Sequence, residues 1–271
     1  MINNSPIGIF DSGIGGLSVM SDIHSLLPNE SLFYIADSLY APYGCMTTKS
    51  VIERSVTVAD FLINYQNCKI IVVACNTATA NAIRELRRLY DIPIVGMEPA
   101  VKPASIATKL GRVGVLATSG TLESAKFSSL LDTYSGKVKF YTQACHGLVD
   151  LIERGDIGSK KNKAEIKVLL HSFLEPLVKN KIDTIVLGCT HYILIRDLIE
   201  GMIGPEIRVI DTGQAVAAEV KRKLLKYQLQ SCDSETKHSI WSNSSNPNIE
   251  TIINCTAKYL QGQYKFYSNW P

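Results

Sequence analysis

Two apolar runs that each end at a cysteine constrain the fold of this chain more than any other feature. In the first, the β-branched residues 70–73 lead to Cys75, and a helical pattern follows at once. In the second, residues 184–188 lead to Cys189 in the same way. A short apolar run followed by a helix is typical of a βα unit in a parallel sheet. The chain is therefore predicted to present two thiols at strand ends, 114 residues apart.

The other predicted strands repeat the same order in two halves of the chain. The first set covers residues 7–10, 32–36, 70–73 and a short strand within residues 93–99, and the second lies within residues 113–121, 138–147, 184–188 and 208–213. Helical patterns separate most of these runs, which favours parallel strands. An ordered series of four matching strands indicates an internal duplication of one α/β half.

The end of the chain is predicted to return to the first half. The second set of strands is complete by residue 212, yet a helix to about residue 228 and one more strand and helix follow. We therefore expect a discontinuous first domain, residues 1–99 plus 213–271, and a second domain at residues 100–212.

Composition excludes several classes of protein. The 271 residues are 46% hydrophobic and 20% charged, which is ordinary for a globular protein. The net charge of +3 is spread along the chain without a basic run that alternates with aromatic residues, so no nucleic-acid partner is expected. Neither a signal peptide nor an apolar stretch of eighteen residues is found, so we expect a cytoplasmic protein without a membrane span. Seven cysteines without a C-x-x-C pair suit reduced thiols.

Two thiols at equivalent strand ends suggest a specific chemistry. Ligands of open parallel sheets bind at the carboxyl ends of the strands. If the halves face each other across a cleft, Cys75 and Cys189 approach one substrate from opposite sides. One thiolate can then remove a proton from a carbon while the other thiol returns one to the opposite face, which inverts the configuration. A free thiol has a pKa of about 8.5, and a helix N-terminus lowers it.

Other polar residues at the strand ends can assist this reaction. Asp11 follows the first strand and His191 lies two residues after Cys189, so both are candidate acids or bases. Hydroxyl groups and backbone N–H groups at helix N-termini can bind carboxylates without arginine. The hydroxyl candidates are Ser12, Thr77, Thr118, Thr121 and Thr190.

A family resemblance rests on five motifs in this order: FDSGIGGLSV, APYG, VVACNTATA, VLGCTHY and VIDTG. Together they resemble the glutamate racemases of the cofactor-independent aspartate/glutamate racemase superfamily, over nearly the whole chain to about residue 220. The resemblance implies two pseudo-symmetric three-layer α/β/α domains with mostly parallel sheets and the active site in the cleft between them. It also implies interconversion of L- and D-glutamate without cofactor or metal, D-glutamate supply for peptidoglycan, and a homodimer.

The resemblance also assigns residues. Cys75 would deprotonate the D-enantiomer and Cys189 the L-enantiomer, with Asp11, His191 and Glu153 at the supporting acid/base positions. The family often has proline where His146 stands, in the segment that leads to Glu153. The implied substrate-binding residues are Asp11, Ser12, Tyr43, Gly44, Asn76, Thr77, Thr118, Thr121, Thr190 and His191.

Several alternatives stay open at this point. Aspartate racemases of the same superfamily share both cysteines. A dinucleotide-binding enzyme is suggested by the glycine-rich turn at residues 13–16 and by Asp37, which ends the next strand. A two-lobed protein could also bind an amino acid without chemistry, and Cys189-x-His191 could be half of a metal site, although zinc takes three or four ligands. The remaining cysteines are interpreted as structural: Cys45, Cys68, Cys145, Cys232 and Cys255.

Overall fold

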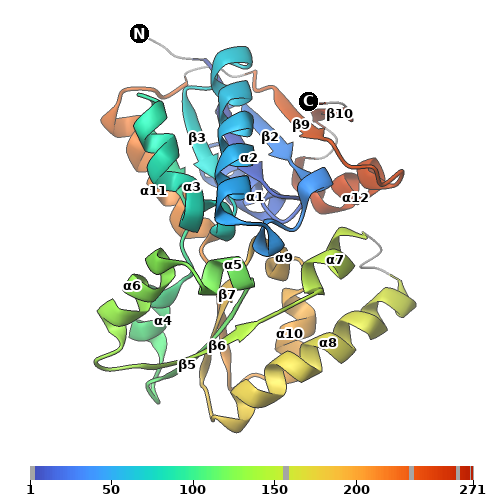
Figure 1. Ribbon diagram of the computed structural model, residues 1–271. Coiled ribbons are helices and arrows are strands. Elements are labelled where there is room, and N and C mark those ends of the chain that lie inside the picture. The colour runs from blue at the N-terminus through green and yellow to red at the C-terminus, as the bar shows by residue number, and fades with distance from the viewer. Residues whose placement is uncertain (1–3, 155–158, 232–234, 261–262, 269, 271) are drawn as a thin grey trace.

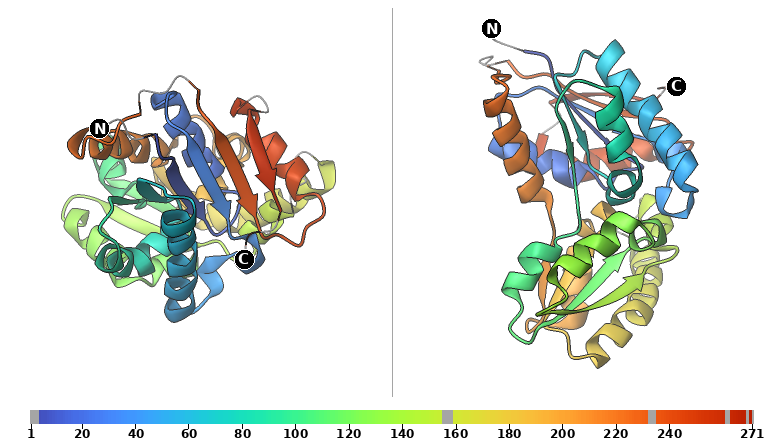
Figure 2. Two further views of the ribbon diagram at one scale, coloured as in Figure 1. Left: turned by 90° about the horizontal axis from the view of Figure 1, so that it is seen from above. Right: turned by 60° about the vertical axis from the view of Figure 1, so that its left-hand side comes forward.

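The computed structural model describes residues 4–154, 159–231, 235–260, 263–268 and 270 of the chain. Two parallel β-sheets dominate it, and they lie one above the other in Figure 1. Helices cover both faces of each sheet, and the right-hand view in Figure 2 shows the same two-lobed arrangement. This architecture confirms the predicted α/β class with two related halves.

The first sheet has six strands in the described part of the chain, in the order β10-β9-β2-β1-β3-β4. Its strands are β1 (Ile7–Asp11), β2 (Leu32–Ala36), β3 (Ile70–Val73), β4 (Ile94–Gly96), β9 (His238–Ser242) and β10 (Tyr264–Tyr267). The second sheet has the order β6-β5-β7-β8. Its strands are β5 (Arg112–Ala117), β6 (Lys139–Ala144), β7 (Thr184–Gly188) and β8 (Arg208–Ile210).

The two sheets share one topology. The series β2-β1-β3-β4 in the first sheet corresponds to β6-β5-β7-β8 in the second, strand for strand in chain order. The equivalent strands β3 and β7 are the ones that precede the two cysteines. The pairing of strands that the duplicated sequence pattern predicted is thereby confirmed, and both thiols come to the carboxyl end of their sheets.

The helices that cover the sheets follow the strands in alternation. They are α1 (Leu17–Leu26), α2 (Thr48–Asp60), α3 (Asn76–Leu89), α4 (Val101–Ala107), α5 (Ser119–Leu122), α6 (Ala125–Tyr134), α7 (Leu148–Glu153), α8 (Lys160–Lys179), α9 (Thr190–Ile193), α10 (Arg196–Ile203), α11 (Gly213–Lys226) and α12 (Ile249–Thr256). Among the described residues, no helix combines the length and the apolar character that a bilayer crossing requires.

Alternating side chains of the first sheet supply two separate cores, as expected for a sheet covered on both faces. Ile9 and Val72 belong to one buried cluster, whereas Phe10 and Val73 belong to the other. The first of these clusters continues into the second half of the chain. Apolar packing therefore joins the two halves as well as filling each of them.

Three details differ from the sequence-based expectation. Strand β10 was not predicted, because its four residues alternate between half-buried and exposed and form no apolar run. The amphipathic pattern of residues 163–178 predicted that Val178 belongs to the buried stripe of α8, but this residue is 44% exposed. Cys45 and Cys255 are exposed rather than part of a core, whereas Cys68 and Cys145 are buried, and Cys232 lies outside the described residues.

Candidate active site

One cavity at the carboxyl ends of the two sheets contains both strand-end cysteines. Its walls are formed by Asp11, Ser12, Pro42, Tyr43, Gly44, Cys75, Asn76, Thr77, Thr118, Val149, Gly188, Cys189, Thr190 and His191. A larger open groove shares Gly44 with it but contains neither thiol. The smaller cavity is therefore the candidate site.

The structure brings the predicted site residues together. All of them line the cavity except Thr121 and Glu153, each of which contacts a lining residue from behind. The Thr121 hydroxyl is 3.1 Å from the hydroxyl of Thr77, and Glu153 Oε1 is 2.5 Å from His191 Nε2. Residues on both sheets thus form a single cluster.

Cys75 is held at the N-terminus of α3. Its backbone is extended, and its sulfur accepts a hydrogen bond from the backbone N–H of Ala78 at 3.5 Å. The thiol donates to the hydroxyl of Ser12 at 3.8 Å. Burial, reinforced by the negative charge of Asp11, raises the pKa of Cys75 well above its ordinary value, although the Ala78 and Ser12 hydrogen bonds oppose this. At neutral pH Cys75 is therefore a protonated thiol.

Asp11 is the carboxylate next to Cys75. It is fully buried and accepts hydrogen bonds from the backbone N–H groups of Ser12 at 2.7 Å and Gly16 at 2.6 Å. The hydroxyl of Thr190, from the second half, donates to it at 3.0 Å. Burial raises the pKa of Asp11, and the charge of His191 and the Thr190 hydrogen bond oppose this rise. Because the Ser12 hydroxyl also donates to Asp11 at 3.2 Å, a chain of contacts runs from Cys75 through Ser12 to Asp11.

A second chain of contacts starts at Cys189. His191 Nδ1 lies 3.8 Å from the Cys189 sulfur, and His191 Nε2 lies 2.5 Å from Glu153 Oε1. The backbone N–H of Ile14, from the first half, donates to the same Glu153 oxygen at 2.7 Å. Burial alone would lower the pKa of His191, but its contacts with Cys189 and Glu153, together with the charge of Asp11, raise that pKa well above its ordinary value. His191 is therefore an imidazolium at neutral pH.

The interpretation of Cys189-x-His191 as half of a metal site has no support in this geometry. Among the residues that the structure describes, no group of three or more His, Cys, Asp and Glu side chains is placed to hold a metal ion. Both ring nitrogens of His191 are already engaged by Cys189 and Glu153.

Neutral polar groups complete the cavity. The hydroxyls of Thr77, Thr118 and Thr121 lie within 2.8 to 3.1 Å of one another and connect α3 of the first half to α5 of the second. The Asn76 side chain is buried, and within the described part of the chain its amide nitrogen and oxygen have no hydrogen-bond partner. A buried amide without a partner costs free energy, so this group is available to a ligand.

The glycine-rich turn after β1 packs against the second half. A Cβ added to Gly13 would come within 1.9 Å of Glu153 Oε1, and one added to Gly15 within 2.6 Å of the backbone nitrogen of His191. Because Gly13 and Gly15 have no side chains, Glu153 and His191 can pack directly against the turn. The space that a pyrophosphate would occupy in a dinucleotide-binding enzyme is filled by protein.

Asp37, the other residue that suggested a dinucleotide site, already has hydrogen bonds to both oxygens of its carboxylate. Its buried carboxylate accepts two hydrogen bonds from Arg54, at 2.9 and 3.0 Å, and one from the hydroxyl of Tyr43 at 2.5 Å. The amide of Asn243 donates at 2.6 Å. Sequence reasoning identified Asp37 only by its place at a strand end and missed this role as an anchor for Tyr43.

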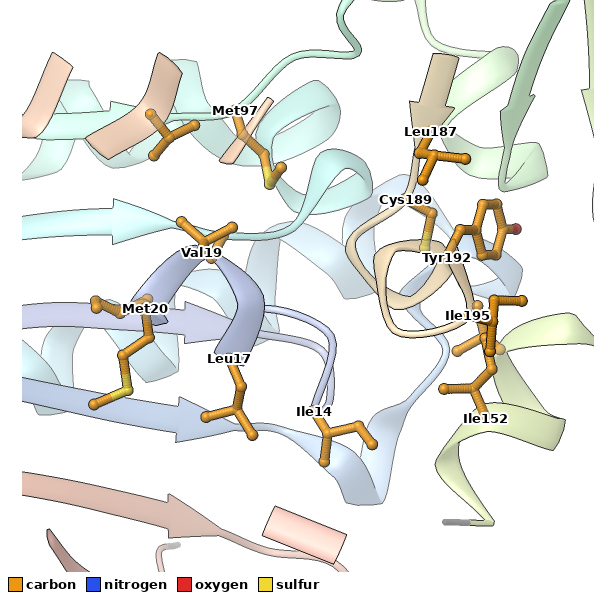
Figure 3. Close-up of a cluster of buried hydrophobic side chains, with 14 of the residues drawn as sticks. Ile14, Leu17, Val19, Met20, Met97, Ile152, Leu187, Cys189, Tyr192 and Ile195 are labelled. Carbon is orange, nitrogen blue, oxygen red and sulfur yellow. The ribbon is translucent and has the colours of Figure 1, made fainter. Parts of the chain in front are cut away.

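The side chains between the two sheets pack without a break. Figure 3 shows Ile14 and Leu17 of the first half near Ile152 and Ile195 of the second, with Cys189 at the edge of the same cluster. This contact fixes the turn after β1 relative to α7 and α9, and so fixes Glu153 relative to His191.

Comparison with known proteins agrees with this geometry. The family model of Asp/Glu/Hydantoin racemase matches residues 7–220. The chain belongs to this racemase family. It is therefore an isomerase, as the sequence resemblance predicted.

Individual members of the family resemble nearly the whole chain. A glutamate racemase of Pseudomonas putida strain W619 is 46% identical over 251 residues, which cover 92% of this chain and 93% of that relative. The Escherichia coli glutamate racemase, solved in complex with L-glutamate and the activator UDP-MurNAc-ala, superimposes with a TM-score of 0.85 at 30% identity over 97% of both chains. The Francisella tularensis glutamate racemase, solved with D-glutamate, gives a TM-score of 0.83 at 25% identity over 99% of this chain and 98% of that one.

Proposed function

We propose that this protein is a glutamate racemase that interconverts L- and D-glutamate without a cofactor. One proton is removed from one face of the α-carbon, and one proton is returned to the opposite face. The observation that carries the proposal is the single cavity that contains Cys75 and Cys189 at equivalent strand ends. The glutamate racemases that are similar over nearly the whole chain support the choice of substrate.

In the direction from L to D, Cys189 acts as the base. Its thiolate, paired with the His191 imidazolium 3.8 Å away, takes the proton from the α-carbon of L-glutamate. The thiol of Cys75 gives its proton to the opposite face, so that one C–H bond breaks and another forms at the same carbon. In the reverse direction the roles exchange, and Asp11 and Glu153 adjust the charge of the two thiols through Ser12 and His191.

Neutral donors supply most of the proposed contacts to the two carboxylates of the substrate. None of the described residues that line the cavity is lysine or arginine. We assign substrate binding to backbone N–H groups at the N-terminus of α3, to the free Asn76 amide, and to hydroxyls on both halves. The proposed binding set is Asp11, Ser12, Tyr43, Gly44, Asn76, Thr77, Thr118, Thr121, Thr190 and His191. The His191 imidazolium is then the one cationic side chain among the described residues that line the cavity.

The proposal extends to the cellular role and organisation that the family resemblance implies. We propose that the D-glutamate supplies peptidoglycan synthesis in the cytoplasm and that the enzyme is a homodimer. Residues 1–99 with 213–271 would form the first domain and residues 100–212 the second, which the membership of the strands in the two sheets supports.

A rate comparison tests the proposed function and its nearest alternative. The purified protein is incubated separately with L-glutamate, D-glutamate, L-aspartate and D-aspartate, and the change in optical rotation is followed. The proposal expects both glutamate enantiomers to converge on the racemic mixture and both aspartates to react at least about tenfold more slowly, a difference of about 1.4 kcal/mol in the barrier. Faster aspartate turnover would make it an aspartate racemase, and no turnover of any of them would indicate a binding protein.

A further inference from the structure

The segment after β9, which lies beyond the part of the chain matched by the family model, reaches the loop that closes the candidate site. Strand β9 is hydrogen-bonded to β2, and Figures 1 and 2 show it alongside β2 in the first sheet. The loop after β2, residues 37–44, leads to Tyr43 and Gly44, which line the cavity. The two segments are therefore neighbours at the carboxyl end of the sheet.

Asn243 joins these two segments with both groups of its side-chain amide. Its Nδ2 donates to Asp37 Oδ1 at 2.6 Å, and its Oδ1 accepts from the backbone N–H of Leu39 at 2.9 Å. At neutral pH no other natural side chain of this size offers a donor and an acceptor in the same plane, because aspartate is ionised and only accepts. The side chain thus closes a ring of hydrogen bonds over the first turn of the loop.

The contact with Asp37 passes directly to the cavity wall. The same carboxylate accepts from the Tyr43 hydroxyl at 2.5 Å and from Arg54, whose side chain is 17% exposed while that of Asp37 is 0% exposed. A buried carboxylate with four charge-assisted or short hydrogen bonds is a rigid anchor. Removing one donor leaves part of its charge unmatched and loosens the remaining contacts.

The loop also touches the second chain of contacts. The hydroxyl of Ser38 donates to Glu153 Oε2 at 3.3 Å, and the other oxygen of Glu153 holds His191. A shift of the loop would therefore disturb the substrate wall at Tyr43 and, more weakly, the orientation of Glu153.

We propose that Asn243 is a positioning residue for the racemase reaction: by holding Asp37 and Leu39 it fixes the loop that places Tyr43 and Gly44 against the substrate. The inference rests on the proposed function. Asn243 does not touch the substrate, so its effect reaches the cavity only through the loop.

The test compares Asn243→Ala with Asn248→Ala, a matched change in the segment that follows. Asn248 is exposed, and its side chain makes no capping hydrogen bond to α12. Asn243→Ala should raise KM for L-glutamate about tenfold, the expected effect of losing a hydrogen bond to a charged group, with kcat within about threefold of wild type. Asn248→Ala should match the wild type in both. Equal values for the two variants would overturn the proposal.

A second variant gives a readout that a purely structural role would not produce. Asn243→Asp keeps the shape but places a carboxylate beside Asp37, and two adjacent carboxyls share a proton as the pH falls. The activity of this variant relative to wild type should therefore rise as pH is lowered, because protonation restores a donor. A constant ratio across pH would contradict the proposal even if Asn243→Ala failed to fold.

Calorimetric titration with racemic glutamate separates the two levels of inference. If the wild type binds glutamate without racemising it, the proposed function fails, but a roughly tenfold weaker Kd for Asn243→Ala would still support the positioning role. If the wild type racemises glutamate and Asn243→Ala binds as tightly as Asn248→Ala does, only the positioning role fails. Absence of wild-type binding would overturn both.

Discussion

The two thiol sites have the same backbone setting and different chemical surroundings. Each cysteine follows a central strand, β3 or β7, and precedes a helix. Cys75 is connected through the neutral hydroxyl of Ser12 to Asp11, whereas Cys189 is connected through the His191 imidazolium to Glu153. Duplication of the fold accounts for the matching positions, whereas the polar side chains that surround each thiol differ.

The difference means that the two thiols lie in different electrostatic surroundings. On the Cys75 side, burial and a nearby carboxylate hold the proton on sulfur. On the Cys189 side, a cation stands next to the sulfur. A thiol that keeps its proton can donate it, and a neighbouring cation favours a thiolate, so this arrangement suits the proposed L-to-D direction. In the proposed mechanism, turnover from D to L needs the opposite assignment of donor and acceptor.

Each half also holds the carboxylate of the other. Thr190 of the second half donates to Asp11, and Ile14 of the first half donates to Glu153. The halves are therefore linked through the two groups that distinguish them, and a change in one chain of contacts is expected to affect the other.

The largest effect should come from removing either thiol. Cys75→Ala and Cys189→Ala should each lower racemisation of both enantiomers by about 10³-fold or more, because a proton acceptor or donor on one face is lost. Cys255→Ala, at an exposed position, should match the wild type. Optical rotation measures the rate and circular dichroism the fold. A variant at either site with turnover near that of wild type would disprove the two-thiol mechanism.

A smaller loss should follow from crowding the turn that packs against the Cys189 side. A methyl group at Gly15 meets the backbone and ring of His191 at 2.6 Å, so Gly15→Ala must displace the imidazolium. A shift of about 1 Å in such a group lowers kcat/KM by about 10²-fold. In Gly201→Ala the added methyl meets nothing within 4 Å. That control should keep full activity, and equal activity of the two variants would refute close packing of the turn against His191.

Weakening the charge on the Cys189 side should have a moderate effect that depends on pH. Glu153→Gln removes the carboxylate that helps to raise the pKa of His191. The imidazolium is present below that pKa and is lost as pH rises through it, so the alkaline fall in L-to-D kcat should begin at lower pH in the variant. At neutral pH we expect kcat to drop about 10- to 100-fold.

The control for this experiment is Glu165→Gln on α8, which removes only an exposed carboxylate 3.9 Å from Arg154. It should leave the pH profile of kcat unchanged. If both variants kept the wild-type profile, His191 would not owe its charge to Glu153.

The smallest effect on activity should come from substitution in a histidine pair far from the thiols. This substitution is expected to change stability without changing catalysis. His24 and His238 contact each other with ring centroids 5.0 Å apart, and burial lowers the pKa of His238 to about 4. The unfolded state then binds more protons between pH 6.5 and 4, so the free energy of unfolding should fall as pH falls through this window.

His238→Gln should reduce that acid-induced loss of stability without changing kcat at pH 7. His171→Gln, at an exposed position of α8, should leave the acid-induced loss of stability unchanged. Denaturant unfolding at several pH values measures the free energy of unfolding of both variants. An unchanged pH dependence in His238→Gln would show that the histidine pair does not control acid stability.

Local patterns were sufficient to predict most of the fold. The apolar runs before Cys75 and Cys189, and their partners in each half, form strands where predicted, because buried parallel strands leave a continuous apolar signal. Strand β10 left no such signal, since it lies at a sheet edge with half of its side chains exposed. Edge strands are specified by their neighbours more than by their own residues.

The site was predictable only in part. Residues that immediately follow a strand, such as Asp11 and Cys189, were identified from their positions, whereas Glu153 entered only through the family resemblance. The link from Asn243 to Asp37 spans 206 residues and leaves no periodic or motif signal in either segment. Contacts of this kind depend on which strands become neighbours, and a single sequence does not contain that information.

The central claim is that one thiol acts on each face of the same carbon, and deuterium incorporation tests it most directly. L-glutamate is incubated in D₂O, and the reaction is stopped early for mass analysis of both enantiomers. If two thiols act, the D-glutamate formed carries one deuterium at the α-carbon while the remaining L-glutamate carries none. The same holds with the enantiomers exchanged. Product that retains the original hydrogen would indicate a single base on one face and would contradict the account.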